Sequence, residues 1–198
     1  MKRLKLGVLA SGGGSNLQSI IDRSLDGSLS ADVTVVISNN SGAGALERAR
    51  KHGIDALHIS TVTEGSAEAA DKRIADEMAA RKVDIVVLAG YMKKVGSVLL
   101  KMYDGKILNI HPALLPKFGG GNMYGIHVHE AVIAAGETES GVTIHLVDNK
   151  YDHGPILAQV RVPVLPDDTP EILQKRVLVK EHELYPQTIQ KFAEQLEQ

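Results

Sequence analysis

Apolar residues in the first half of the chain form short runs that are separated by helical patterns. Runs typical of buried strands occupy residues 4–10, 33–37, 56–59 and 83–88. Helical spacing of apolar residues follows at 17–25, 45–51 and 67–81. Glu64 and Gly65 are predicted to lie in a loop. Strands that alternate with helices in this way predict a parallel sheet with right-handed crossovers.

The second half of the chain predicts antiparallel strands and a long final helix. Its expected elements are a helix over 97–103, a strand over 107–111, a helix over 127–135 and a strand hairpin over 142–147 and 156–164. The final helix is expected to start at Thr169, with Pro170 in its first turn, and to kink or divide at Pro186. We therefore expect one α/β domain with a Rossmann-like, mostly parallel sheet flanked by helices, and antiparallel strands in its C-terminal part.

Composition narrows the class of protein. The 198 residues are most simply one domain, and 22 basic residues against 24 acidic ones give a net charge of −2, so neither nucleic acid nor a membrane is an expected partner. The absence of cysteine excludes a disulfide framework, a thiolate metal site and a cysteine nucleophile. The N-terminal apolar run is too short for a signal peptide, and we expect a soluble cytoplasmic protein.

The first predicted strand runs directly into the glycine turn Ser11-Gly-Gly-Gly-Ser-Asn16. A strand, a glycine turn and a helix in this order present backbone N–H groups and a positive helix end to an anion. No Gly-Lys-Ser/Thr follows, and Leu17 stands where a dinucleotide fingerprint needs its third glycine. We predict a loop for a single phosphate group with Ser15 and Asn16 as donors. A tight turn with Ser15 as helix N-cap is the alternative.

A second motif, Asn109-Ile-His-Pro-Ala-Leu-Leu-Pro116, ends another strand. Asn109 and His111 are two residues apart, so their side chains share one face, and Pro112 ends the ladder pairing. An amide and an imidazole placed in this way can hold and protonate a polarised carbonyl group, although an ordinary strand exit with a satisfied histidine has the same pattern. Because ligands gather beyond the carboxyl ends of such strands, we expect the glycine turn, the Gly90 loop and this motif to share one cleft.

Four further features are weighed in relation to this cleft. The stretch 117–125 is too rich in glycine for regular structure and is predicted to be a mobile loop, with a lid over the cleft as its functional interpretation. His127 and His129 are expected to be surface or packing residues. Asp152 is either a turn former or a partner that orients a cleft histidine. Glu181 falls in the inward stripe of the final helix with Leu173, Val177 and Leu184, which indicates that it faces a cavity.

Taken together, the two motifs and Gly141-Val-Thr-Ile-His-Leu-Val-Asp-Asn-Lys-Tyr-Asp-His-Gly-Pro155 resemble the phosphoribosylglycinamide formyltransferase family of purine biosynthesis. The resemblance implies a catalytic trio of Asn109, His111 and Asp152. It implies that the ribonucleotide is bound by Gly14, Ser15, Asn16 and Glu181. It implies that the folate pocket is formed by Met92, Lys93, Lys94, Val95, Asn109, Asp148 and Asn149.

The implied reaction moves a formyl group from 10-formyltetrahydrofolate, the co-substrate, to the amine of N1-(5-phospho-D-ribosyl)glycinamide, with no metal. Asn109 and a protonated His111 would stabilise the formyl oxygen, and Asp152 would raise the pKa of His111. Residues 1–105 would form the phosphate-binding half and 106–198 the catalytic and folate-binding half. The expected oligomeric state is a monomer or a homodimer.

The chain departs from the family pattern at Ala67, where many relatives have a basic residue, at Leu178, where glutamine is usual, and in the glycines 119–121. These departures are expected to affect affinity more than reaction type. Relatives such as methionyl-tRNA formyltransferase normally carry an extra domain, for which 198 residues leave no room. Two alternatives stay open: formyl transfer to an amino-sugar nucleotide, and a nucleotide-binding module without catalysis.

Overall fold

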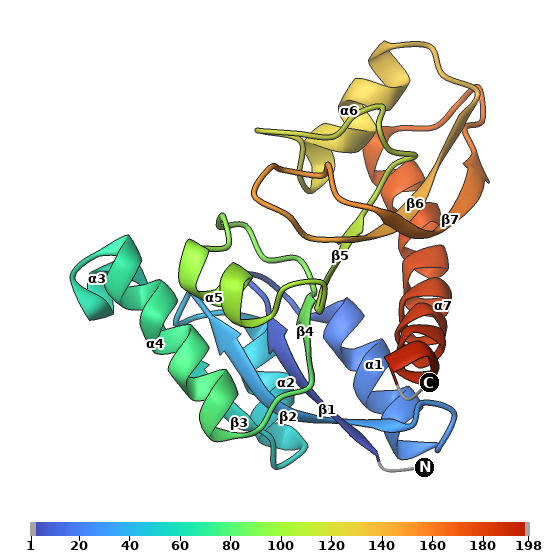
Figure 1. Ribbon diagram of the computed structural model, residues 1–198. Coiled ribbons are helices and arrows are strands. Elements are labelled where there is room, and N and C mark those ends of the chain that lie inside the picture. Colours follow the sequence, from blue (N-terminus) through green and yellow to red (C-terminus); the bar gives the residue numbers. More distant parts are fainter. Residues whose placement is uncertain (1–2, 197–198) are drawn as a thin grey trace.

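A computed structural model describes residues 3–196 (Figure 1). Within this range the chain forms, in order, β1 (Leu4–Leu9), α1 (Ser15–Leu25), β2 (Ala31–Ser38), α2 (Gly44–Lys51), β3 (Asp55–His58), α3 (Thr61–Glu64), α4 (Ala67–Ala80), β4 (Ile85–Leu88), α5 (Ser97–Met102), β5 (Ile107–His111), α6 (Ile126–Ala134), β6 (Glu139–Leu146), β7 (Ile156–Pro163) and α7 (Pro170–Leu196). Each predicted strand is present within a few residues of its expected limits.

The strands form one sheet in the order β3-β2-β1-β4-β5-β6-β7. The first five pair in parallel, and β5, β6 and β7 pair antiparallel. The predicted α/β class, with a mostly parallel sheet and a C-terminal hairpin, is confirmed. From β1 the chain adds strands toward one edge of the sheet (β2, β3), and from β4 it adds them toward the other edge. The loops that follow β1 and β4 therefore run in opposite directions. Ligands of such sheets bind in the crevice between two loops of this kind.

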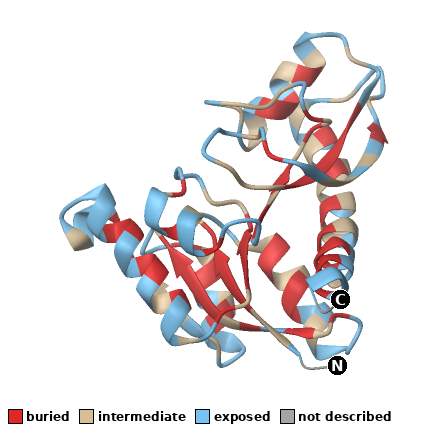
Figure 2. Ribbon diagram, in the orientation of Figure 1, coloured by how far each residue is buried: buried red, intermediate tan, exposed pale blue. Residues whose placement is uncertain are grey.

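Apolar side chains cover both faces of the sheet and form two cores. One core joins the sheet to α1, α2 and α7, and the other joins it to α4 and α5. Figure 2 shows the buried residues gathered in the strands and on the sides of the helices that face them. In Figure 1, β5 connects the part with β1–β4 to the part with β6, β7 and α6, and α7 runs alongside both. Residues 3–196 contain no helix that combines the length and the apolar character needed to cross a membrane.

One sequence expectation is wrong, and one of the two outcomes expected at Pro186 is excluded. Glu64 ends the short helix α3 instead of lying in a loop, because Ser60 and Thr63 form a reciprocal capping box that stabilises this single turn. Pro186 does not divide the final helix, which continues as one element from Pro170 to Leu196. Proline removes one helical hydrogen bond, but Tyr185 and Ile189 beside it are fully buried, and their packing offsets that loss. Thr169 accepts a hydrogen bond from the backbone N–H of Ile172, which confirms it as the helix start.

Gly154 allows the chain to turn closely against β6. A Cβ atom at this position would lie 1.9 Å from the carbonyl oxygen of Leu146. Gly154→Ala is therefore expected to lower the free energy of unfolding by about 1–3 kcal/mol, as overpacking does. Denaturant titration measures this loss. Gly121→Ala is the matched control, because its Cβ would meet nothing within 4 Å. Equal stability of the two variants would contradict the close approach.

Candidate active site

A cleft of about 850 Å³ opens beyond the carboxyl ends of β4 and β5. Its wall is formed by the segments that sequence analysis singled out, which confirms that the glycine turn, the Gly90 loop and the Asn109 motif share one cleft. Among the predicted site residues, those that line the cleft are Ser15, Asn16, Met92, Lys93, Lys94, Val95, Asn109, His111, Asp148, Asp152 and Glu181. Gly14 and Asn149 are not among its lining residues.

Four polar side chains meet at the centre of the cleft. His111 Nδ1 lies 3.6 Å from Asp152 Oδ2, and His145 Nε2 lies 3.5 Å from Asp152 Oδ1. The Asn109 amide nitrogen lies 3.1 Å from His145 Nε2 and 3.4 Å from Asp152 Oδ1. The antiparallel register places Asn109 of β5 opposite His145 of β6, so the two side chains meet across the strand pair. The contact between His111 and Asp152 that sequence analysis left open is present.

The backbone geometry fixes which nitrogen of His145 faces the main chain. His145 Nδ1 donates to the Leu146 carbonyl oxygen at 2.8 Å. His145 Nε2 lies 3.1 Å from the Asn109 amide nitrogen and 3.5 Å from Asp152 Oδ1, so it faces both side chains. The second N–H of Asn109 points to Asp152 at 3.4 Å, a long contact that a better acceptor can replace.

The glycine-rich loop contacts the two ionisable partners through its backbone. His111 Nε2 donates to the Phe118 carbonyl oxygen at 2.8 Å, and the Gly120 N–H donates to Asp152 Oδ2 at 2.9 Å. Residues 120–125 line the cleft, as a lid would, and the mobility of the loop stays a prediction. Both ring nitrogens of His111 therefore face protein acceptors in this arrangement.

Burial dominates the protonation of His111, which is 3% exposed. Burial lowers its pKa below the ordinary histidine value, against the opposing charge of Asp152 and the Phe118 carbonyl, which both raise it. The predicted raising of this pKa by Asp152 is confirmed as a contribution, and burial outweighs it. Burial raises the pKa of Asp152, but contacts with His145, His111 and the Gly120 N–H outweigh it and hold the pKa below the usual range.

The glycine turn brings the N-terminus of α1 to the cleft. Gly14 has φ of +75° and lies so close to α2 that a Cβ would be 2.7 Å from the Ala45 Cα, so only glycine fits. Ser15 is the first residue of α1 and makes no side-chain cap, which makes the alternative of Ser15 as N-cap wrong. Arg48 of α2 stabilises the glycine turn, because its Nε donates to the Gly13 carbonyl oxygen at 2.8 Å.

Asn16 and Glu181 form a buried polar pair beside this turn. Asn16 Nδ2 donates to Glu181 Oε2 at 2.5 Å, and Asn16 Oδ1 is buried without a partner among the described residues. Burial raises the pKa of Glu181, against the Asn16 hydrogen bond, which lowers it. The predicted inward stripe of α7 is confirmed, since Leu173, Val177 and Glu181 are buried and Leu184 is half-buried against the core. A ligand that donates a hydrogen bond would satisfy the unpaired Asn16 oxygen.

Comparison with known proteins settles the family. Residues 4–189 match the family model described as formyl transferase. The chain belongs to this family. It is 45% identical over 195 residues to the chloroplastic phosphoribosylglycinamide formyltransferase of Vigna unguiculata, with 98% of this chain and 62% of that protein covered. It is 38% identical over 187 residues to the phosphoribosylglycinamide formyltransferase of Escherichia coli, with 94% and 86% covered.

Solved structures of the family have the same fold. Glycinamide ribonucleotide transformylase 1 from Symbiobacterium toebii superposes with a TM-score of 0.92 at 42% identity, with 98% of this chain and 89% of that chain covered. The resemblance inferred from the three motifs is confirmed. The chain spans 62% and 65% of the length of the relatives from Vigna unguiculata and Arabidopsis thaliana.

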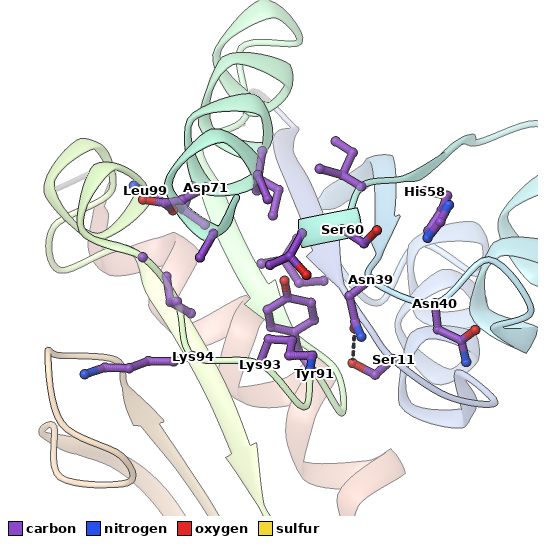
Figure 3. A pocket seen from close by; sticks show the side chains of 18 of the residues that line it. Ser11, Asn39, Asn40, His58, Ser60, Asp71, Tyr91, Lys93, Lys94 and Leu99 are labelled. Atoms are coloured by element: carbon purple, nitrogen blue, oxygen red, sulfur yellow. Dashed lines mark hydrogen bonds between the residues drawn. The ribbon is translucent and has the colours of Figure 1, made fainter. Parts of the chain in front are cut away.

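The departures from the family pattern lie in two cavities. Leu178 lines the cleft, and Ala67 lines a second cavity of about 760 Å³. Figure 3 shows this second cavity from close by. Tyr91, Lys93 and Lys94 line both cavities. An effect of Ala67 and Leu178 on substrate affinity in this formyl transferase stays a prediction.

Sequence analysis missed several residues around the cleft. His145 was assigned only to an alternating strand, and its place opposite Asn109 depends on the register of β5 and β6. Arg48 contacts the glycine turn at Gly13, and burial, together with the Arg48 charge, lowers the pKa of His182. The sequence offered one sign that His182 is partly buried, namely that it directly follows Glu181, which was predicted to face inward.

His129 is a packing residue, as predicted, but it also lines the cleft. It is 1% exposed, and its Nδ1 has no partner among the described residues. Burial, with a smaller effect of the nearby His111, lowers its pKa from 6.5 to about 4. His127, two residues earlier, is exposed and pairs with Glu130.

The buried His129 is expected to make stability depend on pH. Its pKa is lower in the folded state, so the unfolded chain binds more protons between pH 6.5 and about 4, and the folded state loses stability as the pH falls through that range. His129→Leu is expected to lose less stability than the wild type over this range, measured by denaturant titration at several pH values. His127→Leu should behave like the wild type, and a His129 variant with an unchanged pH slope would contradict the assignment.

Proposed function

We propose that this formyl transferase moves the formyl group of 10-formyltetrahydrofolate to the amine of N1-(5-phospho-D-ribosyl)glycinamide. The observation that carries the proposal is a single cleft that holds the Asn109, His111 and Asp152 cluster between the glycine turn and the segment 92–95. The relatives from Vigna unguiculata and Escherichia coli bear the name of this activity, which supports the same assignment here. Their names do not support an amino-sugar nucleotide acceptor or a module without catalysis.

The chemistry requires stabilisation of one developing charge and movement of one proton. The acceptor amine attacks the formyl carbon, and the carbonyl oxygen of the resulting tetrahedral intermediate becomes negative. The Asn109 amide donates to this oxygen in place of its long contact with Asp152, and a protonated His111 adds a second donor. The bond between the formyl carbon and N10 of the folate then breaks, and the proton lost by the amine passes to N10.

His111 and Asp152 act as a pair in this mechanism. His111 Nε2 donates to Phe118 in the structure, so the loop 117–125 must give up this contact before Nε2 reaches a substrate. The Asp152 carboxylate stays beside Nδ1 and stabilises the imidazolium that forms. This arrangement resembles other acyl-transfer sites, in which a carboxylate orients a histidine.

The acceptor and the donor approach from opposite sides of the cluster. We assign the acceptor phosphate to Gly14, Ser15 and Asn16, where α1 presents its N-terminal N–H groups. Glu181 accepts from the amine end of the same substrate. The folate side is assigned to Met92, Lys93, Lys94, Val95, Asn109, Asp148 and Asn149. Residues 1–105 then form the phosphate-binding half, and 106–198 form the catalytic and folate-binding half.

The remaining assignments follow from the reaction class. The two donors on the formyl oxygen come from the protein, so the mechanism assigns no role to a metal. The partners are the two small substrates, without nucleic acid or membrane, and the enzyme acts in the cytoplasm as a monomer or homodimer.

Acceptor competition tests the proposal. Purified protein is mixed with 10-formyltetrahydrofolate, and the conversion of the folate is followed by absorbance. The reaction is run without an acceptor, with N1-(5-phospho-D-ribosyl)glycinamide (glycinamide ribonucleotide), and with an amino-sugar nucleotide. We expect tetrahydrofolate to form only with glycinamide ribonucleotide. Folate consumption without any acceptor would instead indicate a deformylase, and consumption only with the amino sugar would overturn the assigned acceptor.

A further inference from the structure

The segment 91–96 separates the cleft from the second cavity and has no regular secondary structure. The backbone N–H groups of Lys93, Lys94 and Val95 make no hydrogen bond within the described residues. The side chains of Lys93 and Lys94 likewise have no hydrogen bond or ion pair in that range and are exposed. These groups are free to bind a ligand, but they do not fix the position of the segment. Its position therefore depends on contacts at its two ends.

Ser11 holds the first end. The Ser11 N–H donates to the Gly90 carbonyl oxygen at 2.9 Å, and the Met92 N–H donates to Ser11 Oγ at 2.8 Å. Ser11 Oγ in turn donates to Asn39 Oδ1 at 2.5 Å, which Figure 3 shows as a dashed line. This end is thus tied to the glycine turn that follows β1.

Asp71 of α4 holds the second end. Its carboxylate, on a residue 8% exposed, accepts from the Val98 N–H at 2.7 Å and from the Leu99 N–H at 3.4 Å. In Figure 3, Asp71 lies beside Leu99 at the start of α5. Helix α5 has Gly96 at its own N-cap position, without a side-chain cap. The acceptor that this helix lacks locally is supplied by Asp71, which lies 27 positions before Val98 in the chain.

Gly96 fits this contact closely. A Cβ at position 96 would lie 2.2 Å from Asp71 Cγ, so the carboxylate packs directly on the backbone where the segment ends. Asp71 forms no ion pair with a basic side chain within residues 3–196. Its buried charge is compensated by backbone N–H groups, and such charge-assisted hydrogen bonds are among the stronger ones.

We propose that Asp71 is a positioning residue for the folate co-substrate, because its carboxylate anchors the start of α5 and thereby fixes the segment 92–95. This inference rests on the proposed function, which places the folate against that segment. Asp71 touches neither the His111 cluster nor the glycine turn. Its loss should therefore weaken folate binding without changing the binding of the ribonucleotide.

Steady-state kinetics with each substrate varied in turn test this. Asp71→Ala is expected to raise the KM for 10-formyltetrahydrofolate about ten-fold, the change that follows from losing one helix cap on the binding segment. The KM for glycinamide ribonucleotide should not change. Asp71→Asn keeps one oxygen that can accept from Val98 and should recover part of the loss. Gly96→Ala displaces the carboxylate from the opposite side and should raise the same KM.

Ser66→Ala is the matched control, since Ser66 Oγ caps the same helix α4 at the Ala69 N–H but does not contact α5. It should lower thermal stability and leave both KM values unchanged. An unchanged folate KM in Gly96→Ala and in whichever Asp71 variant folds would overturn the proposal. So would an equal rise of both KM values, or the same rise in Ser66→Ala.

Amide hydrogen exchange without substrate separates this inference from the proposed function. Exchange of the hydrogen-bonded Met92, Val98 and Leu99 N–H groups should be faster in Asp71→Ala, or in Asp71→Asn if the alanine variant does not fold, and unchanged in Ser66→Ala. If the wild type does not consume formyl folate, the proposed function fails, and exchange alone decides whether Asp71 anchors the segment. Equal exchange in the Asp71 and Ser66 variants would overturn the anchor itself.

Discussion

His111→Ala is expected to lower kcat by about 10²–10⁴-fold, the usual contribution of a general acid–base residue. The imidazole is the proton carrier of the reaction and, when charged, the second donor to the formyl oxygen. Asn109 remains in place, so part of the stabilisation of that oxygen survives the substitution. The KM for each substrate should change much less than kcat. Steady-state kinetics at saturating concentrations of both substrates measure the effect.

His52→Ala is the matched control for this variant. His52 is exposed at the end of α2 and contacts Gln18, outside the cleft. Its removal should leave kcat unchanged. Circular dichroism and thermal unfolding establish that the His111 variant retains the fold. A folded His111→Ala variant with wild-type kcat would remove His111 from the mechanism.

Asp152→Asn is expected to lower kcat by about 10²-fold or more, as loss of a group that orients and charges a general acid does. Asp152 has φ of +52°, a region that asparagine also tolerates, so the substitution preserves the backbone. The amide can still accept from the Gly120 N–H. What is lost is the negative charge beside His111 Nδ1.

The pH profile tells this electrostatic role from a packing role. The Asp152 charge raises the pKa of His111, so its removal lowers that pKa further. His111 then loses its proton at a lower pH than in the wild type. On the alkaline side of the rate profile, where activity decreases as the pH rises, the decrease should therefore begin at a lower pH. The exposed Asp104→Asn is the control and should keep the wild-type profile. A lower rate with an unshifted limb would contradict the role of the charge.

Local sequence patterns were sufficient to predict features that depend on a single strand or helix. Alternation along β5 predicted that Asn109 and His111 share a face, and the spacing along α7 predicted that Glu181 points inward. Both are properties of a single strand or helix. His145 could not be placed in this way, because its contact with Asn109 depends on how β6 pairs with β5.

Burial was the second property that sequence could not supply. The pair of His111 and Asp152 was anticipated through the family resemblance, yet the pKa of His111 is lowered. The fold removes the imidazole from water, with Phe118 of the loop 117–125 against its Nε2, and no local pattern reports that burial. Asp71 illustrates the same limit. In the sequence it is one of several charged residues of a polar helix, but in the structure it is buried against Gly96 and the start of α5.

The transfer of a labelled formyl group tests the central claim most directly. The protein would be incubated with 10-[¹³C]formyltetrahydrofolate and glycinamide ribonucleotide, and the products followed by ¹³C NMR in parallel with His111→Ala. We expect the label to appear as an amide formyl group on the glycinamide nitrogen, in amounts equal to the tetrahydrofolate formed, and to be nearly absent with the variant. Label that accumulates as free formate, or transfer that persists without His111, would contradict the account.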